Sequence, residues 1–381
     1  MSNLPRRLIL PLATTGCLML TGLLALLGIN AFDEPLDPGT EAWLAPPPKT
    51  VAAEQNGYFI ELGLAVQTDQ PLQVGRAIAA DINRLPLPVD IFQNQFDTLA
   101  RRHGKLWQLA DLPKCRDKTA DCVNEIYRQA DTYRKLIERE KQPLTNYYAM
   151  IAMPAYENAG APKVVRSDMP AVPLAQLARA DMALTIREGQ ADKLQAVVSK
   201  MAQDQQYWIR ALSHSRLLSD AMVARLQVAA SQRFIREIQA HHPAIKPLLA
   251  PQLTPSLQQF ASHNSQRIMR AIWQGELRFA WYQFQSVYDQ PEYVEDASMN
   301  KLADWFFLPN ATLNQFRRTA EQIVESGRHM DECESGIRWF YNPDGREYNC
   351  VGSADKANYS RNIVAAQKQA AEFARWLDTV S

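Results

Sequence analysis

A long uncharged segment near the N-terminus constrains this chain more than any other feature. Residues 8–30, LILPLATTGCLMLTGLLALLGIN, contain no charged side chain. A helix needs about 20 apolar residues to cross the hydrocarbon core of a bilayer. Arg6 and Arg7 precede the segment and four acidic residues follow it, and basic flanks stay in the cytoplasm. The sequence therefore predicts one transmembrane anchor over residues 1–30, in a single-pass protein of a bacterial inner membrane with its body in the periplasm.

Three other interpretations of the N-terminus stay open. A cleaved signal peptide would end at INA, before Phe32, but its apolar region is usually shorter, at about 7–15 residues. A lipoprotein would use Cys17, yet the residues after Cys17 remain apolar. Twin-arginine export would use the RR of RRLIL. The length of the segment favours the retained anchor.

Four cysteines in the body form two local pairs in the sequence. Cys115 and Cys122 are seven positions apart, and Cys333 and Cys350 bracket an aromatic stretch. An even number of cysteines outside the cytoplasm predicts disulfide bonds, and four cysteines allow three connectivities. We expect local pairing, 115 with 122 and 333 with 350. Zinc would need tighter spacings and nearby histidines, whereas the nearest, His329, stands alone, so no metal site is expected.

The rest of the chain reads as a linker followed by one helical domain. Residues 31–56 carry five prolines and no apolar stripe, which predicts an extended linker. Residues 57–381 then form the expected periplasmic domain. Its first stretch, GYFIELGLAV over 57–66, has the composition of a strand, but only 15 glycines in the chain indicate a mostly helical protein.

Apolar stripes with helical spacing recur through this domain. We expect helices over 173–189, 191–215, 222–238, 254–289, 310–327 and 359–377. Thr254 and Thr312 are the predicted N-terminal caps of two of them, and Gly189 and Gly327 are predicted stops. In the third helix the stripe steps every four residues, and it consists of Met222, Leu226, Ala230, Phe234 and Ile238.

The segment IRWFYNPDGREYNCV is the one exception. Asn-Pro-Asp-Gly favours a tight turn, and its flanks are rich in aromatic and β-branched residues. The predicted fold is thus a mostly α irregular bundle or array of antiparallel helices. A small C-terminal β-hairpin completes it, and the transmembrane helix precedes it.

No catalytic or cofactor-binding motif stands out, so we assign no catalytic, cofactor or metal residues. His241 and His242 lie where a helix should end, which explains them better than metal binding does. Glu325 and Glu334 each start a Glu-Ser-Gly triplet. Lytic transglycosylases use such a Glu-Ser pair, with the glutamate as the catalytic acid. The downstream glycine- and glutamine-containing stretch of those enzymes is absent, however.

Charge and aromatic content bear on the partners. The 41 basic and 41 acidic residues cancel, which argues against nucleic-acid binding. The stretch WQGELRFAWYQFQSVYD could line a groove for a peptide, lipid or glycan, but burial of a central helix is the simpler explanation.

Several short motifs resemble uncharacterised proteobacterial single-span envelope proteins. These motifs are NGYF, the C-x₆-C loop, LPNATLN and YNPDG. The resemblance implies a location and a helical fold but no activity. The anchor, the dominance of helices, the neutral charge and the missing catalytic motifs predict a membrane-tethered component that binds or scaffolds an envelope protein partner. The alternatives are a periplasmic enzyme acting on cell-wall glycan or envelope lipid, and a ligand-binding helical module.

Overall fold

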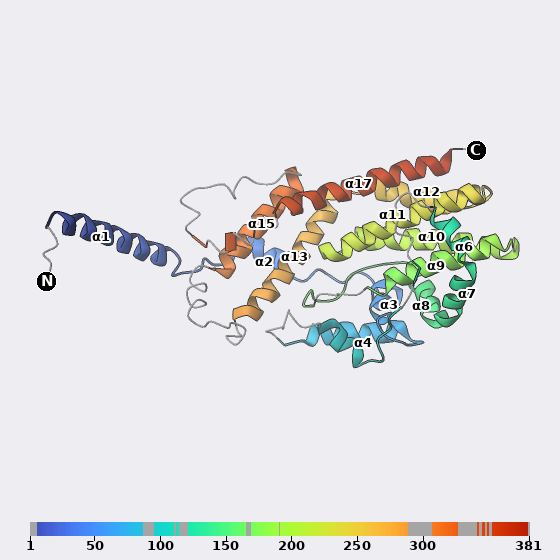
Figure 1. The fold of residues 1–381 in the computed structure, drawn as a ribbon, viewed down its shortest axis with the longest axis horizontal. Coiled ribbons are helices and arrows are strands. Elements are labelled where there is room, and N and C mark those ends of the chain that lie inside the picture. Colours follow the sequence, from blue (N-terminus) through green and yellow to red (C-terminus); the bar gives the residue numbers. More distant parts are fainter. Residues whose placement is uncertain are drawn as a thin grey trace. The chain divides into compact units, whose positions relative to one another are not determined.

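The structure is a computed structural model of the 381-residue chain. It describes residues 6–86, 95–109, 112–113, 121–164, 169–189, 191–288, 307–326, 341–342, 345–346, 349 and 353–379. These residues form fifteen α-helices and no strand, so the chain is mostly helical, as the apolar periodicity predicts (Figure 1).

The chain divides into two compact units. Unit 1 combines Met1–Ala45 with Val287–Asn358, and unit 2 combines Pro46–Ser286 with Tyr359–Ser381. Unit 1 contains α1 (Arg6–Ile29), α2 (Pro38–Leu44) and α15 (Pro309–Ser326). Unit 2 contains α3 (Gly57–Gly63), α4 (Pro71–Arg84), α5 (Gln95–Arg101), α6 (Cys122–Arg128), α7 (Ala130–Arg139), α8 (Lys141–Ile151), α9 (Ala171–Arg187), α10 (Ala191–Ser213), α11 (Leu218–His241) and α12 (Ile245–Ser262), with most of α13 (Ser265–Tyr288) and of α17 (Ser353–Asp378).

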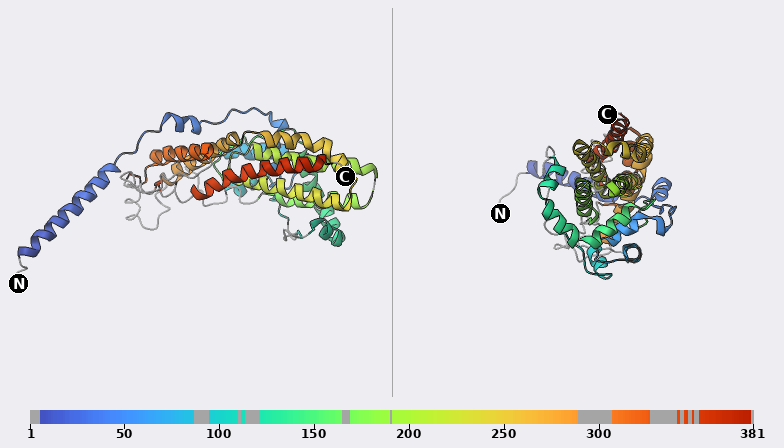
Figure 2. Two further views of the ribbon diagram at one scale, coloured as in Figure 1. Left: turned by 90° about the horizontal axis from the view of Figure 1, so that it is seen from above. Right: turned by 90° about the vertical axis from the view of Figure 1, so that its right-hand side faces the viewer.

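Helix α10 lies at the centre of unit 2. It contacts α8, α9, α11 and α12, and α12 and α17 lie alongside α11 (Figures 1 and 2). The predicted stripe of α10 is buried from Val197 to Leu212, which confirms this part of the sequence analysis. Gln367 on α17 ties this layer together, because its amide donates to the carbonyl oxygens of Phe260 and His263.

Two glycines bring α3 and α4 into close contact. A Cβ atom on Gly63 would lie 1.9 Å from the carbonyl oxygen of Pro71, and one on Gly75 would lie 1.6 Å from that of Phe59. The strand expected over 57–66 is therefore wrong. Asn56 caps a helix instead, since its side-chain oxygen accepts the Tyr58 N–H at 3.1 Å.

The predicted cap at Thr254 is also wrong. Helix α12 runs through that position and contains both Pro251 and Pro255, while Thr254 donates its hydroxyl to Asp378 on α17. The helix ends later, at Ser262. Asn264 caps α13 by accepting the N–H groups of Gln266 and Arg267.

The linker expected to be extended over residues 31–56 instead contains a helix in its unit 1 part, and one of its residues caps a second helix. Helix α2 occupies Pro38–Leu44. Asp33 accepts the N–H groups of Asn310 and Ala311 at 2.7 and 3.0 Å, so it caps α15 in place of the predicted cap at Thr312. Arg317 of α15 binds Asp37 at 3.1 Å.

The predicted β-hairpin is wrong as far as the described residues reach. Gly345, Arg346 and Asn349 are helical, and the Arg346 N–H donates to the Asn342 carbonyl at 3.0 Å, four residues back. Asn342 has a φ of 54°, in the left-handed region of backbone conformation. Its side-chain oxygen accepts the Leu308 N–H, and its side-chain nitrogen donates to Thr312 Oγ1. These two hydrogen bonds hold the segment against α15.

The membrane anchor is also corrected. In the described part of the chain, no helix has both the length and the apolarity that a membrane span requires. This finding contradicts the predicted single-pass inner-membrane placement.

Candidate ligand pocket

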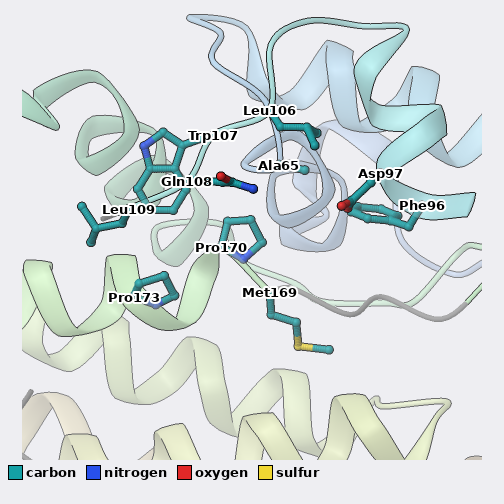
Figure 3. A pocket seen from close by; sticks show the side chains of 10 residues that line it. All are labelled: Ala65, Phe96, Asp97, Leu106, Trp107, Gln108, Leu109, Met169, Pro170 and Pro173. Carbon is teal, nitrogen blue, oxygen red and sulfur yellow. The ribbon is translucent and has the colours of Figure 1, made fainter. Parts of the chain in front are cut away.

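The main apolar cavity of the described residues lies in unit 2, between α5, the segment 106–109 and the start of α9. Its volume is about 370 Å³, within the range of about 300–1,000 Å³ that small-molecule sites occupy. Figure 3 shows side chains from all three elements converging on it. The lining consists of Ala65, Phe96, Asp97, Leu106, Trp107, Gln108, Leu109, Met169, Pro170 and Pro173.

Backbone pairing fixes one wall of the pocket. Val66 and Leu106 form an isolated antiparallel bridge, and the Trp107 N–H donates to the Ala65 carbonyl at 2.9 Å. Gly104 makes the turn before this pairing with a φ of 155°, a backbone conformation that side-chain-bearing residues rarely adopt. The short segment 106–109 is therefore held against the end of α3 by main-chain contacts.

The Trp107 side chain is fixed as well. Its indole nitrogen donates to Glu140 Oε2 at 2.8 Å, and the residue is 5% exposed. Glu140 also accepts from Arg139 Nε at 2.7 Å. A buried indole whose N–H is satisfied presents only its apolar ring to the cavity.

The opposite wall is the beginning of α9, where prolines remove the N–H groups that a helix N-terminus normally exposes. A helix N-terminus usually offers free N–H groups to an anion. Here Pro170 and Pro173 have no N–H group, and Val172 donates its own to the Met169 carbonyl at 2.9 Å. This helix end therefore presents an apolar surface.

Polar groups in the pocket are few. Eight of the ten lining residues are apolar, and the other two are Asp97 and Gln108. Asp97 is thus the one ionisable side chain among the described residues that line the cavity. General acid–base chemistry commonly uses two titratable groups with different pKa values, so the pocket suits binding better than catalysis.

A buried polar network lies deeper in unit 2 and was not predicted from the sequence. Arg179 pairs with Asp204 at 3.1 Å and donates to Gln227 Oε1 at 3.0 Å. Tyr147 donates to the same aspartate and accepts the Trp208 N–H at 3.2 Å. Burial and the charge of Asp204 raise the pKa of Tyr147 well above its usual value. These groups satisfy one another within the core, which assigns them to structure.

The cysteines expected to pair lie mostly outside the described residues. Cys115, Cys333 and Cys350 lie outside the described residues, so neither predicted disulfide is seen in the described part of the chain. Cys122 is itself disulfide-bonded, with a partner outside the described residues, and Cys17 is free. The choice among the three connectivities stays a prediction.

The adjacent histidines lie at a helix end. His241 is the last residue of α11 and its Nε2 lies 2.8 Å from Asp121 Oδ2, while His242 Nε2 lies 3.1 Å from the Tyr127 hydroxyl. Burial raises the pKa of Tyr127 to about 12. Within the described residues, no group of three or more His, Cys, Asp or Glu side chains could hold a metal ion. Both histidines serve to join α6 to α11.

None of the remaining candidates is among the residues that line the pocket. Glu325 is exposed near the end of α15 in unit 1, and Glu334 lies outside the described residues. The aromatic helix α13 buries Trp273 and Phe284, whereas Phe279, Trp281 and Tyr282 are partly exposed. It is therefore not buried on all sides.

Comparison with known proteins adds no assignment, because no family model, curated protein or solved structure matches the chain. The resemblance to single-span envelope proteins stays a prediction. The pocket itself could have been found only in part from the sequence. Its two prolines before an apolar stripe are a visible signal, but the pairing of Ala65 with Trp107 is not.

Proposed function

We propose that this protein is a ligand-binding helical module whose pocket takes an uncharged, largely apolar small molecule. The observation that carries the proposal is the apolar lining of a cavity of about 370 Å³. Of the three expectations from the sequence, this cavity favours the ligand-binding module over the scaffold and over the enzyme.

The rigidity of the walls supports the proposal. Binding is tighter when the site is formed before the ligand arrives, because less conformational freedom is lost. The indole of Trp107 is held by Glu140, and the backbone of Trp107 is held by Ala65. Gln108 is exposed at the pocket and can orient one polar group of the ligand.

The test uses N-phenyl-1-naphthylamine, an uncharged dye whose emission rises in apolar surroundings, with the full chain. The variant Ala65→Leu adds three carbon atoms to a side chain that lines the cavity, and we expect it to weaken dye binding at least about tenfold. The matched control is Ala229→Leu, at an exposed position on α11. The control should bind the dye as the unchanged protein does.

A second variant guards against a simple folding defect. Leu109→Ala enlarges the same cavity, so it should accept a bulkier dye that the unchanged protein rejects. Equal binding of N-phenyl-1-naphthylamine by Ala65→Leu and the unchanged protein would exclude this pocket as the site. Strong preference for an anionic dye over the uncharged one would contradict the proposed ligand class.

A further inference from the structure

Two proline rings at the start of α9 form a rigid part of the candidate ligand pocket. Pro170 and Pro173 are three positions apart, and both have side chains that line the cavity and are partly exposed. The side chain of proline closes onto its own backbone, so it has little freedom to move. Pro170 has helical backbone angles, with a φ of −55° and a ψ of −26°, and this spacing in a helix places both rings on one face. This wall is therefore a fixed apolar surface.

Aromatic rings lie across the cavity from these prolines. Figure 3 shows the Trp107 side chain on the other side of the pocket from Pro170 and Pro173, and Phe96 of α5 farther along it. The hydrogen bond from the indole N–H to Glu140 fixes the edge of the Trp107 ring. Trp107 is 5% exposed and Phe96 is 2% exposed, so only a small part of each ring faces the cavity. The inner part of the cavity therefore admits a thin ligand more readily than a bulky one.

The chemistry of these walls favours an aromatic ring in the ligand. Domains that bind proline-rich peptides do so through aromatic-lined grooves, so prolines and aromatic rings are a recurrent pair in recognition. Two aromatic rings in contact also gain stabilisation beyond the area that they bury. An alkyl chain gains neither effect, and it loses rotational freedom when rigid walls fix it.

We infer that the ligand carries a flat aromatic ring, which lies between the prolines of α9 and the indole ring of Trp107. Gln108, which is exposed at the pocket, then meets a polar substituent at the edge of this ring. The inference rests on the proposed function, because it names the class of molecule that the same pocket takes.

The test compares three alcohols that have the same number of carbon atoms and one hydroxyl group each. They are 2-naphthol, which is flat and aromatic, decahydro-2-naphthol, which is its saturated form, and decan-1-ol, which is a flexible chain. Each competes for the full chain with N-phenyl-1-naphthylamine, and the loss of dye emission is measured. The two saturated alcohols are the more apolar ones, so a cavity that selects by apolarity alone would bind them more tightly. We expect 2-naphthol to bind at least about fivefold more tightly than either.

Pro173→Ala tests the position of the ring. It removes one ring from the wall and keeps the helix, because alanine is the best helix former. This variant should weaken the binding of 2-naphthol at least about threefold without weakening that of decahydro-2-naphthol. The matched control is Pro255→Ala, since Pro255 is an exposed proline within α12 that does not line the cavity. The control should keep the preference of the unchanged chain, and circular dichroism should show both variants folded.

The outcomes separate this inference from the proposed function. If the dye binds but a saturated alcohol displaces it as well as 2-naphthol does, the inference is wrong and the proposed function stands. A preference for 2-naphthol that Pro173→Ala retains, or that Pro255→Ala loses equally, would also contradict the inference. If the dye does not bind at all, the proposed function fails and the inference fails with it.

Discussion

Arg179 and Asp204 form an ion pair at 3.1 Å in the core of unit 2, where their side chains are 7% and 1% exposed. Removing one partner of a buried pair leaves an uncompensated charge, which costs about 3–5 kcal/mol. We expect Arg179→Met to lower the free energy of unfolding by about that amount in urea titration. The double variant Arg179→Met with Asp204→Leu should recover part of the loss, because it removes both charges. A single variant as stable as the unchanged protein would show that the pair contributes little.

The stability of unit 2 should depend on pH through two histidines. Burial lowers the pKa of His242, with a smaller contribution from His241, and burial also lowers the pKa of His214. The unfolded chain then binds protons near pH 6.5 that the folded chain does not. The free energy of unfolding should therefore fall as the pH drops from about 7 through 6.5, and it should level off below the folded pKa values.

Substitution of both histidines tests this dependence. The variant His214→Gln with His242→Gln should flatten the change in thermal midpoint between about pH 7 and 5.5. His263→Gln, at an exposed position near the end of α12, is the control for the loss of a histidine. An unchanged pH dependence in the double variant would mean that other groups control this range.

The cap supplied by Asp33 can be measured locally. Asp33→Ala removes the acceptor of two N–H groups at the start of α15, and losing a cap costs about 0.5–2 kcal/mol. Hydrogen exchange at Asn310 and Ala311 should accelerate accordingly. Asp33→Asn keeps an oxygen acceptor and should retain much of the protection. Equal exchange in all three proteins would place the cap elsewhere.

The close contact of α3 and α4 predicts that adding one methyl group at Gly75 lowers the stability of the protein strongly. Gly75→Ala would place a Cβ atom 1.6 Å from the Phe59 carbonyl oxygen, so one helix must move. Overpacking of this kind costs about 1–3 kcal/mol or more. Gly22→Ala, where nothing lies within 4 Å of the added atom, should be neutral or slightly stabilising. Similar thermal midpoints for the two variants would contradict the packing described for α3 and α4.

The sequence predicted helices well where the apolar stripe alternates steps of three and four. On α17 the positions Ile363, Ala366, Ala370 and Phe373 follow this rule and are all buried. On α11 the stripe steps by four each time, and each step overshoots a full turn by about 40°. From Met222 to Ile238 the overshoot reaches about 160°, so the two ends face nearly opposite sides. This drift explains why Ile238 is buried and Met222 is exposed.

Contacts distant in sequence account for what could not be predicted. The apolar composition of GYFIELG suggested a strand, but the cap at Asn56 and the approach of Gly75 decide for a helix. Asp33 lies far before the helix that it caps, and no local pattern joins them. The candidate pocket likewise depends on the hydrogen bond from Trp107 to Glu140 and on the start of α9 lining the same cavity as Trp107, which only the tertiary structure shows.

The discontinuous composition of unit 2 has a consequence for synthesis on the ribosome. Lys246 donates to the Thr379 carbonyl across a separation of 133 residues, and Gln367 reaches back to Phe260 and His263. At about 5–20 residues per second, translation of that interval takes on the order of ten seconds. During this interval the faces of α11 and α12 that α17 will cover remain exposed. The nascent chain is then a natural client for chaperones that bind apolar surfaces, and slower translation after residue 286 would lengthen its exposure to aggregation.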